Sequence, residues 1–118
     1  MALGVDLELS AEYFRSGTHF LLTATVYNIG GPDVTVEQYI ILDVFGQYWF
    51  WPMWRESVGN IIRTLETGDY YEHEIILDFI WPDVDGSIEG IRFWAALLDP
   101  GLLQILGDYD MVTFGYGP

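Results

Sequence analysis

Hydrophobic and polar residues alternate along most of the chain with a period of two. Over residues 5–14, apolar side chains occupy the odd positions from Val5 to Tyr13, and acidic or polar side chains occupy most positions between them. Successive side chains of a strand point to opposite faces, so this pattern predicts a strand with one buried and one wet face. The same period predicts a second strand over residues 19–28. Its inner face is expected to carry Phe20, Leu22, Ala24 and Val26.

Turn residues divide the remainder into short segments of the same kind. Glycine, proline and aspartate separate apolar, β-branched and aromatic runs, and only residues 100–108 leave room for one short helical turn. Further strands are expected at residues 34–45, 48–52, 61–67, 70–82, 91–99 and 109–117. The core is expected to include Leu22, Ala24, Val26, Ile40, Leu42, Phe93 and Ala95. The sequence therefore predicts an all-β, antiparallel β-sandwich of seven or eight strands with Greek-key connections.

The length of 118 residues favours one domain over residues 1–118, with residues 1–4 as a domain boundary or an engineered start. The chain has 18 acidic residues against four arginines, a net charge of −14 and no cysteine. Such a charge repels nucleic acid and anionic membrane surfaces and attracts divalent cations. No run approaches the ~18 apolar residues of a membrane span, so membrane insertion is not expected.

A family resemblance extends over residues 5–114. The stretch LLTATVYNIGGPDVTVEQYIIL, followed by IILDFIWP and FWAALLDPG, resembles bacterial immunoglobulin-like accessory domains of the cell-adhesion-related (CARDB-like) kind. The resemblance implies an immunoglobulin-like sandwich, a secreted or cell-surface setting, and a non-catalytic role in adhesion, spacing or assembly. No catalytic residue comes with it. Within this stretch, Asn28 before two glycines is expected to close an Asx-type turn through nearby backbone.

The segment DVDGSIEG carries the strongest ligand-like spacing. Asp83, Asp85 and Glu89 alternate with other residues around Gly86, and oxygen donors in a turning loop are what calcium prefers. The EF-hand pattern needs a further donor and a longer spacing before its glutamate, and both are missing. An ordinary acidic hairpin or corner loop without a cofactor is therefore the favoured interpretation, and calcium is the one candidate cofactor as its alternative.

Residue types that support catalysis are scattered. His19 and His73 fall in different strands, and His73 points away from its neighbours Glu72 and Glu74. Pairs of carboxylates occur by chance among 18 acids, and no serine lies in a nucleophile-elbow context. The expectation is that the protein is not an enzyme. A small hydrolase acting through an acidic pair is the weakest alternative.

The stretch QYWFWPMW holds three of the five tryptophans. A strand there places Tyr48 and Phe50 on one face and Trp49 and Trp51 on the other, so one pair can join the core. The other pair needs a cover or a ligand, because large aromatic rings are seldom left wet. A platform of Tyr48, Trp49, Trp51 and Trp54 would make the chain a carbohydrate-binding module.

The first hypothesis is a non-catalytic immunoglobulin-like accessory module of a secreted or cell-surface protein, with protein domains of the same or a neighbouring chain as partners. The alternative is the carbohydrate-binding module, with polysaccharide as its partner. A cytoplasmic location is the alternative to an extracellular one.

Overall fold

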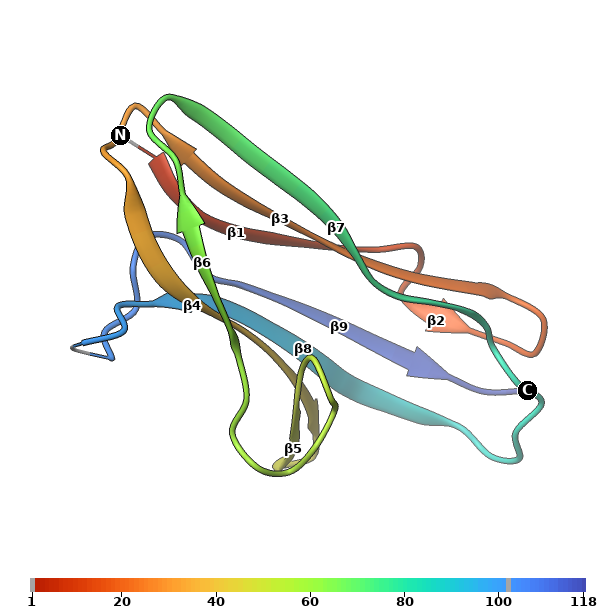
Figure 1. The fold of residues 1–118 in the computed structure, drawn as a ribbon. Helices are drawn as coiled ribbons and strands as arrows, with labels where there is room; N and C mark the ends of the chain where they lie inside the picture. Colours follow the sequence, from red (N-terminus) through yellow and green to blue (C-terminus); the bar gives the residue numbers. More distant parts are fainter. Residues whose placement is uncertain (1, 102) are drawn as a thin grey trace.

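The structure is a computed structural model that describes residues 2–101 and 103–118, and these residues form nine strands and no helix (Figure 1). The strands are β1 (Ala2–Leu9), β2 (Tyr13–Phe14), β3 (His19–Ile29), β4 (Val34–Val44), β5 (Gln47–Phe50), β6 (Ile61–Leu65), β7 (Asp69–Ile80), β8 (Ile88–Leu98) and β9 (Asp110–Tyr116). The alternation of apolar and polar residues thus predicted most of the strands to within a few residues. The all-β prediction is confirmed.

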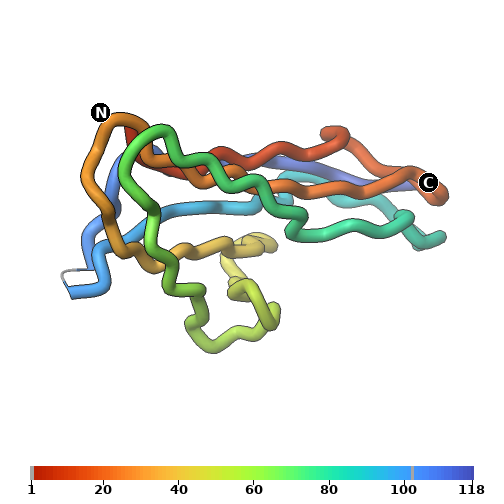
Figure 2. The backbone as a smooth tube through the Cα atoms, turned by 45° about the horizontal axis from the view of Figure 1, so that its top comes forward, coloured from red at the N-terminus to blue at the C-terminus, as the bar shows by residue number. Residues whose placement is uncertain are grey.

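Two sheets pack face to face. The smaller sheet has the order β1-β3-β7, and the larger has the order β2-β9-β8-β4-β5 (Figure 1). β6 pairs with residues 34–38 of β4, and β5 pairs with residues 41–44. The chain between β5 and β6 projects from the body of the sandwich, and the start of β1 and the C-terminus lie at opposite ends of the long axis (Figure 2). The described residues contain no helix that is long and apolar enough to cross a membrane.

The first predicted strand is split between the two sheets. β1 pairs with β3, but residues 10–12 cross the sandwich and β2 pairs with β9 in parallel. Gly115 N donates to Glu12 O at 2.9 Å, and at this bond the crossing chain reaches β9. Because the chain keeps its direction while it changes sheet, this pair departs from the all-antiparallel prediction. The alternation slips at the same place, so Phe14 is buried and Tyr13 is exposed.

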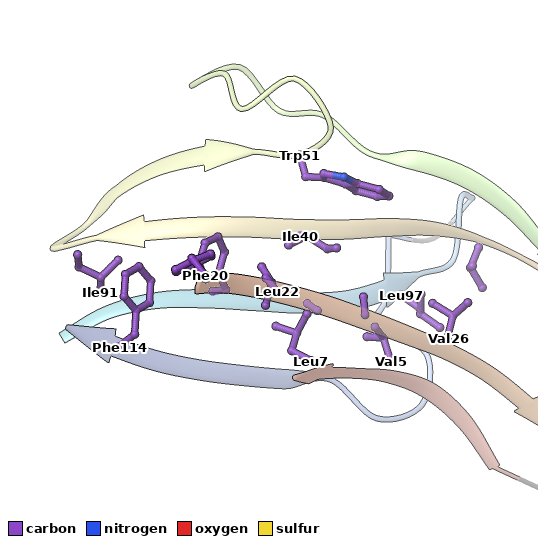
Figure 3. Close-up of a cluster of buried hydrophobic side chains, with 14 of the residues drawn as sticks. Val5, Leu7, Phe20, Leu22, Val26, Ile40, Trp51, Ile91, Leu97 and Phe114 are labelled. Carbon is purple, nitrogen blue, oxygen red and sulfur yellow. The ribbon is translucent and has the colours of Figure 1, made fainter. Parts of the chain in front are cut away.

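The core lies between the sheets and is aromatic at one end (Figure 3). Six of the seven predicted core residues are at most 2% exposed, whereas Leu42 is half-buried because it lies beside the short edge strand β5. The ring of Phe20 in the smaller sheet lies 4.6 Å from that of Phe14 and 5.3 Å from that of Phe114, both in the larger sheet. Aromatic contacts therefore join the two sheets at this end.

The opposite end of the interior is polar. The side-chain amide of the buried Asn28 donates to Pro32 O at 2.9 Å and reaches the carbonyls of Leu65 and Glu66 at 3.3 and 3.2 Å. It therefore ties the β3–β4 connection to the β6–β7 connection, which is a longer reach than the predicted Asx-type turn. Arg63 on β6 crosses to β7, where its guanidinium meets Glu74 at 3.0 Å.

The ends of two predicted segments fall outside the described residues. Residues 2–4, expected to be boundary residues, form the first part of β1, and Met1 is not described. Leu102, in the expected short turn after β8, is not described either. Beside it, Gly101 N donates to Asp99 Oδ1 at 2.8 Å, so an aspartate turn begins this connection.

Gln38 is the least expected member of the core. It lies on the inner face of β4, is 0% exposed, and neither atom of its side-chain amide has a hydrogen-bond partner in the described chain. A buried amide without partners costs roughly 1–3 kcal/mol of stability.

We expect Gln38→Leu to raise the free energy of unfolding by about 1–2 kcal/mol, since leucine removes the unpaired amide at a similar volume. Urea denaturation followed by tryptophan fluorescence measures the change. The matched control is Gln104→Leu at an exposed position. A destabilised Gln38→Leu variant would show that the amide does have partners in solution.

Candidate functional site

The aromatic stretch begins with a two-residue hairpin. Val44 pairs with Gln47, and the two residues between them, Phe45 and Gly46, both have positive φ angles of 52° and 88°. Positive φ at both positions is the type I′ geometry, which matches the twist of paired strands. Gly46 N also donates to Asp43 Oδ1 at 3.0 Å. The turn sets the register of β5 and hence the faces on which its rings lie.

The four candidate platform rings lie in different places. Trp51 is 7% exposed and joins the core, where Figure 3 shows it near Ile40. Trp54 is half-buried and meets the ring of Phe93 edge-on at 5.9 Å. Trp49 lies opposite Leu42 on the inner side of the sheet, and Tyr48 is on the outer side, 49% exposed. The structure therefore gathers no flat platform from these four residues.

The outer side of the larger sheet carries an unbroken apolar row. Met111 pairs with Trp94, Trp94 with Ile41, and Ile41 with Phe50, so one large side chain from each of β9, β8, β4 and β5 lies in register. Their parity is opposite to that of Ile40 and Phe93, which point into the core. Further apolar members of the same outer side follow from the register. They are Tyr39, Tyr48, Ile62, Ala96 and Leu98. We call these nine residues the apolar face.

Few charges interrupt the apolar face. Asp43 and Arg92 lie opposite one another in the next row, and Asp43 Oδ2 accepts from Trp94 Nε1 at 3.2 Å. Glu37, between Leu98 and Ile62, is the other acid within these rows. Most of the 18 acids therefore lie on the smaller sheet, the connections and the open edge at β7.

Sequence reasoning found two members of the apolar face, Tyr48 and Phe50, and missed the rest. Ile41, Trp94 and Met111 are far apart in the chain, and only strand register brings them together. A signal was present, however. Trp94 lies between the inner residues Phe93 and Ala95, and Ala96 follows Ala95. The segment IRFWAALL therefore has an apolar outer side as well as an apolar inner one.

The proposed calcium ligands are not gathered into a cluster. Asp83 and Asp85 are exposed in the β7–β8 connection, and Glu89 lies in β8 with its side chain beside Gly115. Nowhere in residues 2–101 and 103–118 do three or more histidines, cysteines or carboxylates lie close enough to hold a metal ion.

Three other carboxylates influence one another at the start of β9. Asp110 Oδ2 accepts from Leu7 N at 2.8 Å, and Asp108 Oδ2 accepts from the Tyr27 hydroxyl at 3.1 Å. Burial and the charges of Asp110 and Asp108 raise the pKa of Asp6. Burial, the hydrogen bond to Asp108 and the nearby charges raise the pKa of Tyr27 to about 12. Like charges therefore repel one another where β1 meets the start of β9.

The two histidines are separate and on the surface. His19 Nε2 contacts Asp78 Oδ1 across β3 and β7, and His73 Nδ1 contacts Thr25 Oγ1 at 2.6 Å. His73 points away from Glu72 and Glu74, as the period of two predicted, because both glutamates reach inward to Arg63. Neither histidine lies in a constellation of catalytic groups.

The fold is that of CARDB domains, as the resemblance implied. The CARDB domain of a Pyrococcus furiosus protein, crystallised in complex with di-metal ions, superposes over 97% of this chain and 86% of its own length, with a TM-score of 0.59 and 15% sequence identity. The solution structure of a CARDB domain from the same organism superposes over 99% and 98%, with a TM-score of 0.53 and 15% identity. No family model and no curated protein matches the sequence.

We expect Asp6→Asn to stabilise the protein at neutral pH, with a gain that shrinks on acidification. The folded-state pKa of Asp6 is raised, so the folded protein binds its proton more tightly than the unfolded chain does, and this carboxylate costs stability once pH exceeds its ordinary value of 3.8. Urea denaturation at pH 7 and near pH 3 measures both states. Asp69→Asn, at an exposed position on β7, is the control. An equal gain at both pH values would contradict the electrostatic cause.

Proposed function

We propose that this chain is a non-catalytic accessory module that pairs with a second domain of the same fold through its apolar face. The observation that carries the proposal is the register of Met111, Trp94, Ile41 and Phe50 on the outer side of the larger sheet. The CARDB-like fold supports a non-catalytic accessory role in general.

The composition of the apolar face is that of a protein interface. Interface cores are enriched in tyrosine, tryptophan, phenylalanine, methionine and arginine, and depleted in lysine, glutamate and aspartate. The apolar face and its flanking row contain each of the enriched types, and the chain has no lysine at all. Arg92, the single base, lies beside Asp43 in the flanking row. A two-fold axis can place Arg92 of one copy opposite Asp43 of the other, which makes this row self-complementary.

The size of the apolar face sets the strength of pairing. Four strands about 4.8 Å apart, over residues 37–43 at about 3.4 Å each, span roughly 400 Å² in projection. A standard interface needs about 800 Å² from each partner. Pairing of free copies is therefore expected to be weak, and effective only where a high local concentration brings domains together.

Charge makes the pairing dependent on salt. Two copies at −14 each repel one another, although the acids lie mostly away from the apolar face. The Debye length falls from about 10 Å at 0.1 M salt to about 3 Å at 1 M, so salt removes this repulsion while it leaves apolar contact intact. Assembly of this kind suits a secreted or cell-surface setting, which remains our expectation for localisation.

The shape suits a module strung between other domains. The body measures 49 × 27 × 19 Å, and β1 begins at the end opposite the C-terminus (Figure 2). A chain that enters and leaves at opposite ends spaces its neighbours along the long axis and leaves the side of the larger sheet available for lateral contact. Spacing and lateral assembly are thus compatible roles.

Sedimentation equilibrium tests the proposal. We expect a monomer at about 0.05 M NaCl and a reversible dimer at millimolar protein and about 1 M NaCl. Met111→Lys and Phe50→Lys should each weaken the dimer at least tenfold, because a buried lysine ammonium is costly. Added lysine lowers the net negative charge, so repulsion cannot explain such a loss.

The matched control is Tyr71→Lys, which is 62% exposed on the outer side of the smaller sheet and should leave the dimer intact. Circular dichroism melts check that the variants are folded. A monomer at every salt concentration, or a dimer that Met111→Lys leaves unchanged, would refute pairing through the apolar face.

Carbohydrate binding is the second candidate, favoured by the exposed ring of Tyr48 close to Asp43 and Arg92. Polar groups beside an aromatic ring are what sugar hydroxyls need. Tryptophan fluorescence with a panel of polysaccharides separates the two candidates. An emission shift that Tyr48→Ala abolishes would favour the carbohydrate-binding module.

One CARDB neighbour was crystallised in complex with di-metal ions. For this chain, calcium at Asp83, Asp85 and Glu89 is the alternative to an ordinary acidic loop. Since the described residues form no three-donor cluster, we expect no saturable heat of calcium binding below about 1 mM by isothermal titration. A saturable site lost in Asp83→Asn would establish the loop as a calcium site.

A further inference from the structure

A groove of about 730 Å³ runs along the free part of β9. It is lined by the five consecutive residues 111–115 of β9, by Leu9 and residues 11–13 on one side, and by Glu89 and Gly90 of β8 on the other. Neighbouring residues of a strand point to opposite faces, so a groove that touches five in a row extends from the face of β9 to its edge. The groove therefore reaches the backbone of β9 as well as its side chains.

The edge of β9 is open because the chain changes sheets at this place. β2 pairs only with Gly115 and Tyr116, and β1 approaches β9 at its other end, where Asp110 accepts from Leu7 N. Gly115 N and Gly117 N both donate toward the β2 segment. Backbone groups alternate in direction along a strand, so the N–H and C=O of Thr113 point to the same edge of β9 as the N–H of Gly115. No other strand pairs with that edge at Thr113 in the described chain.

The charged side chains that line the groove are both acidic, while Arg92 lies opposite Thr113 and Arg15 lies over the Tyr13 ring just outside it. Its carboxylates are those of Glu12 and Glu89, and the described residues that line it include no arginine, lysine or histidine. Both glutamates are exposed, and the whole molecule carries −14. The opposite wall is apolar at Leu9 and Ala11. The groove thus combines an open strand edge, an apolar wall and an acidic rim.

We propose that this groove binds a short, extended, positively charged segment of a partner polypeptide, which adds to β9 as a strand. Thr113 supplies one donor and one acceptor to the backbone of the segment, the wall at Leu9 and Ala11 packs an apolar side chain, and the two glutamates pair with flanking lysine or arginine. Main-chain bonds give affinity and alternate side chains give specificity in this mode of recognition. The span of residues 111–115 admits about four extended residues at about 3.4 Å each.

An N-acetylated, C-amidated Lys-Val-Lys-Val-Lys peptide is the probe, with Glu-Val-Glu-Val-Glu as its charge-reversed counterpart. Titration followed by NMR on the intact chain should give saturable shifts at residues 111–115 with the first peptide and none with the second. Hydrogen exchange at the Thr113 amide should slow at least tenfold on binding, because strand addition protects that N–H. Cation attraction alone does not protect it.

Matched variants divide the contributions. Thr113→Trp fills the groove and should weaken binding at least tenfold, whereas Thr35→Trp, exposed on β4, should not. Glu12→Gln and Glu89→Gln should each weaken binding about threefold and reduce its salt dependence, the size expected for a rim charge. Glu56→Gln, exposed in the β5–β6 connection, is the control.

Binding that Thr113→Trp, Glu12→Gln and Glu89→Gln all leave unchanged, or binding without protection of the Thr113 amide, would show non-specific attraction to an acidic protein and overturn the proposal. Absence of saturable shifts would overturn it too. Phe50→Lys, which disrupts the apolar face, should retain peptide binding. Met111 lines the groove and belongs to the apolar face, whereas Phe50 belongs to the apolar face alone, so Phe50→Lys separates the two proposals.

Discussion

The cluster of rings around Phe20 holds the two sheets together. Phe20 contacts five other rings, Phe14, Phe79, Trp81, Phe93 and Phe114, at centroid distances from 4.6 to 6.3 Å. Three of these rings belong to the larger sheet, so one side chain of β3 reaches into three strands of the opposite layer. Each ring buries ~150–250 Å², which makes this end the main source of inter-sheet stability. The placement of β2 depends on it, because Phe14 is the residue that brings the crossing chain onto β9.

The polar end of the interior solves a different problem. β7 is an edge strand of 12 residues, and a long edge of this kind invites unwanted strand pairing. Its inward-pointing Glu72 and Glu74 are held by Arg63, whose side chain is only 14% exposed. A register shift opposite Leu22 and Thr23 bends the same strand. Inward charges and bulges are both known means of protecting an edge, so β7 is protected twice.

Period-two alternation predicted the strands and the aromatic core because each of these depends on local spacing. It could not predict that residues 10–12 change sheets, since Leu9, Ala11 and Tyr13 continue the pattern without a break. Buried Asn28 was read as a local turn residue, although its partners Leu65 and Glu66 are distant in sequence. The apolar face was missed for a similar reason, because register between strands is not written in any one segment.

The aromatic stretch around Trp51 shows how far a local pattern reaches. Alternation correctly separated Tyr48 and Phe50 from Trp49 and Trp51, but only the structure assigns the second pair to the inner side. Trp51 follows β5 directly. Its backbone N–H donates to Ile40 O at 2.9 Å, which draws the ring over the core. The first pair is left outside, where it continues the apolar row of β4 and β8.

The contrast between the two sheets explains where binding is to be sought. The chain protects β7, its longest free edge, with charges that point inward and a bulge. No strand pairs with the edge of β9 at Thr113 in the described chain, and the outer side around Trp94 carries the apolar face. Exposure of large apolar surface has a cost in solubility, which the net charge of −14 offsets for the molecule as a whole. Both sheets leave large apolar side chains exposed, among them Ile75 on β7 and Ile62 on β6, so exposure alone does not distinguish them. The β7 edge is protected against strand pairing, whereas no strand pairs with the β9 edge at Thr113 in the described chain, and this difference favours β9 as the edge for strand addition.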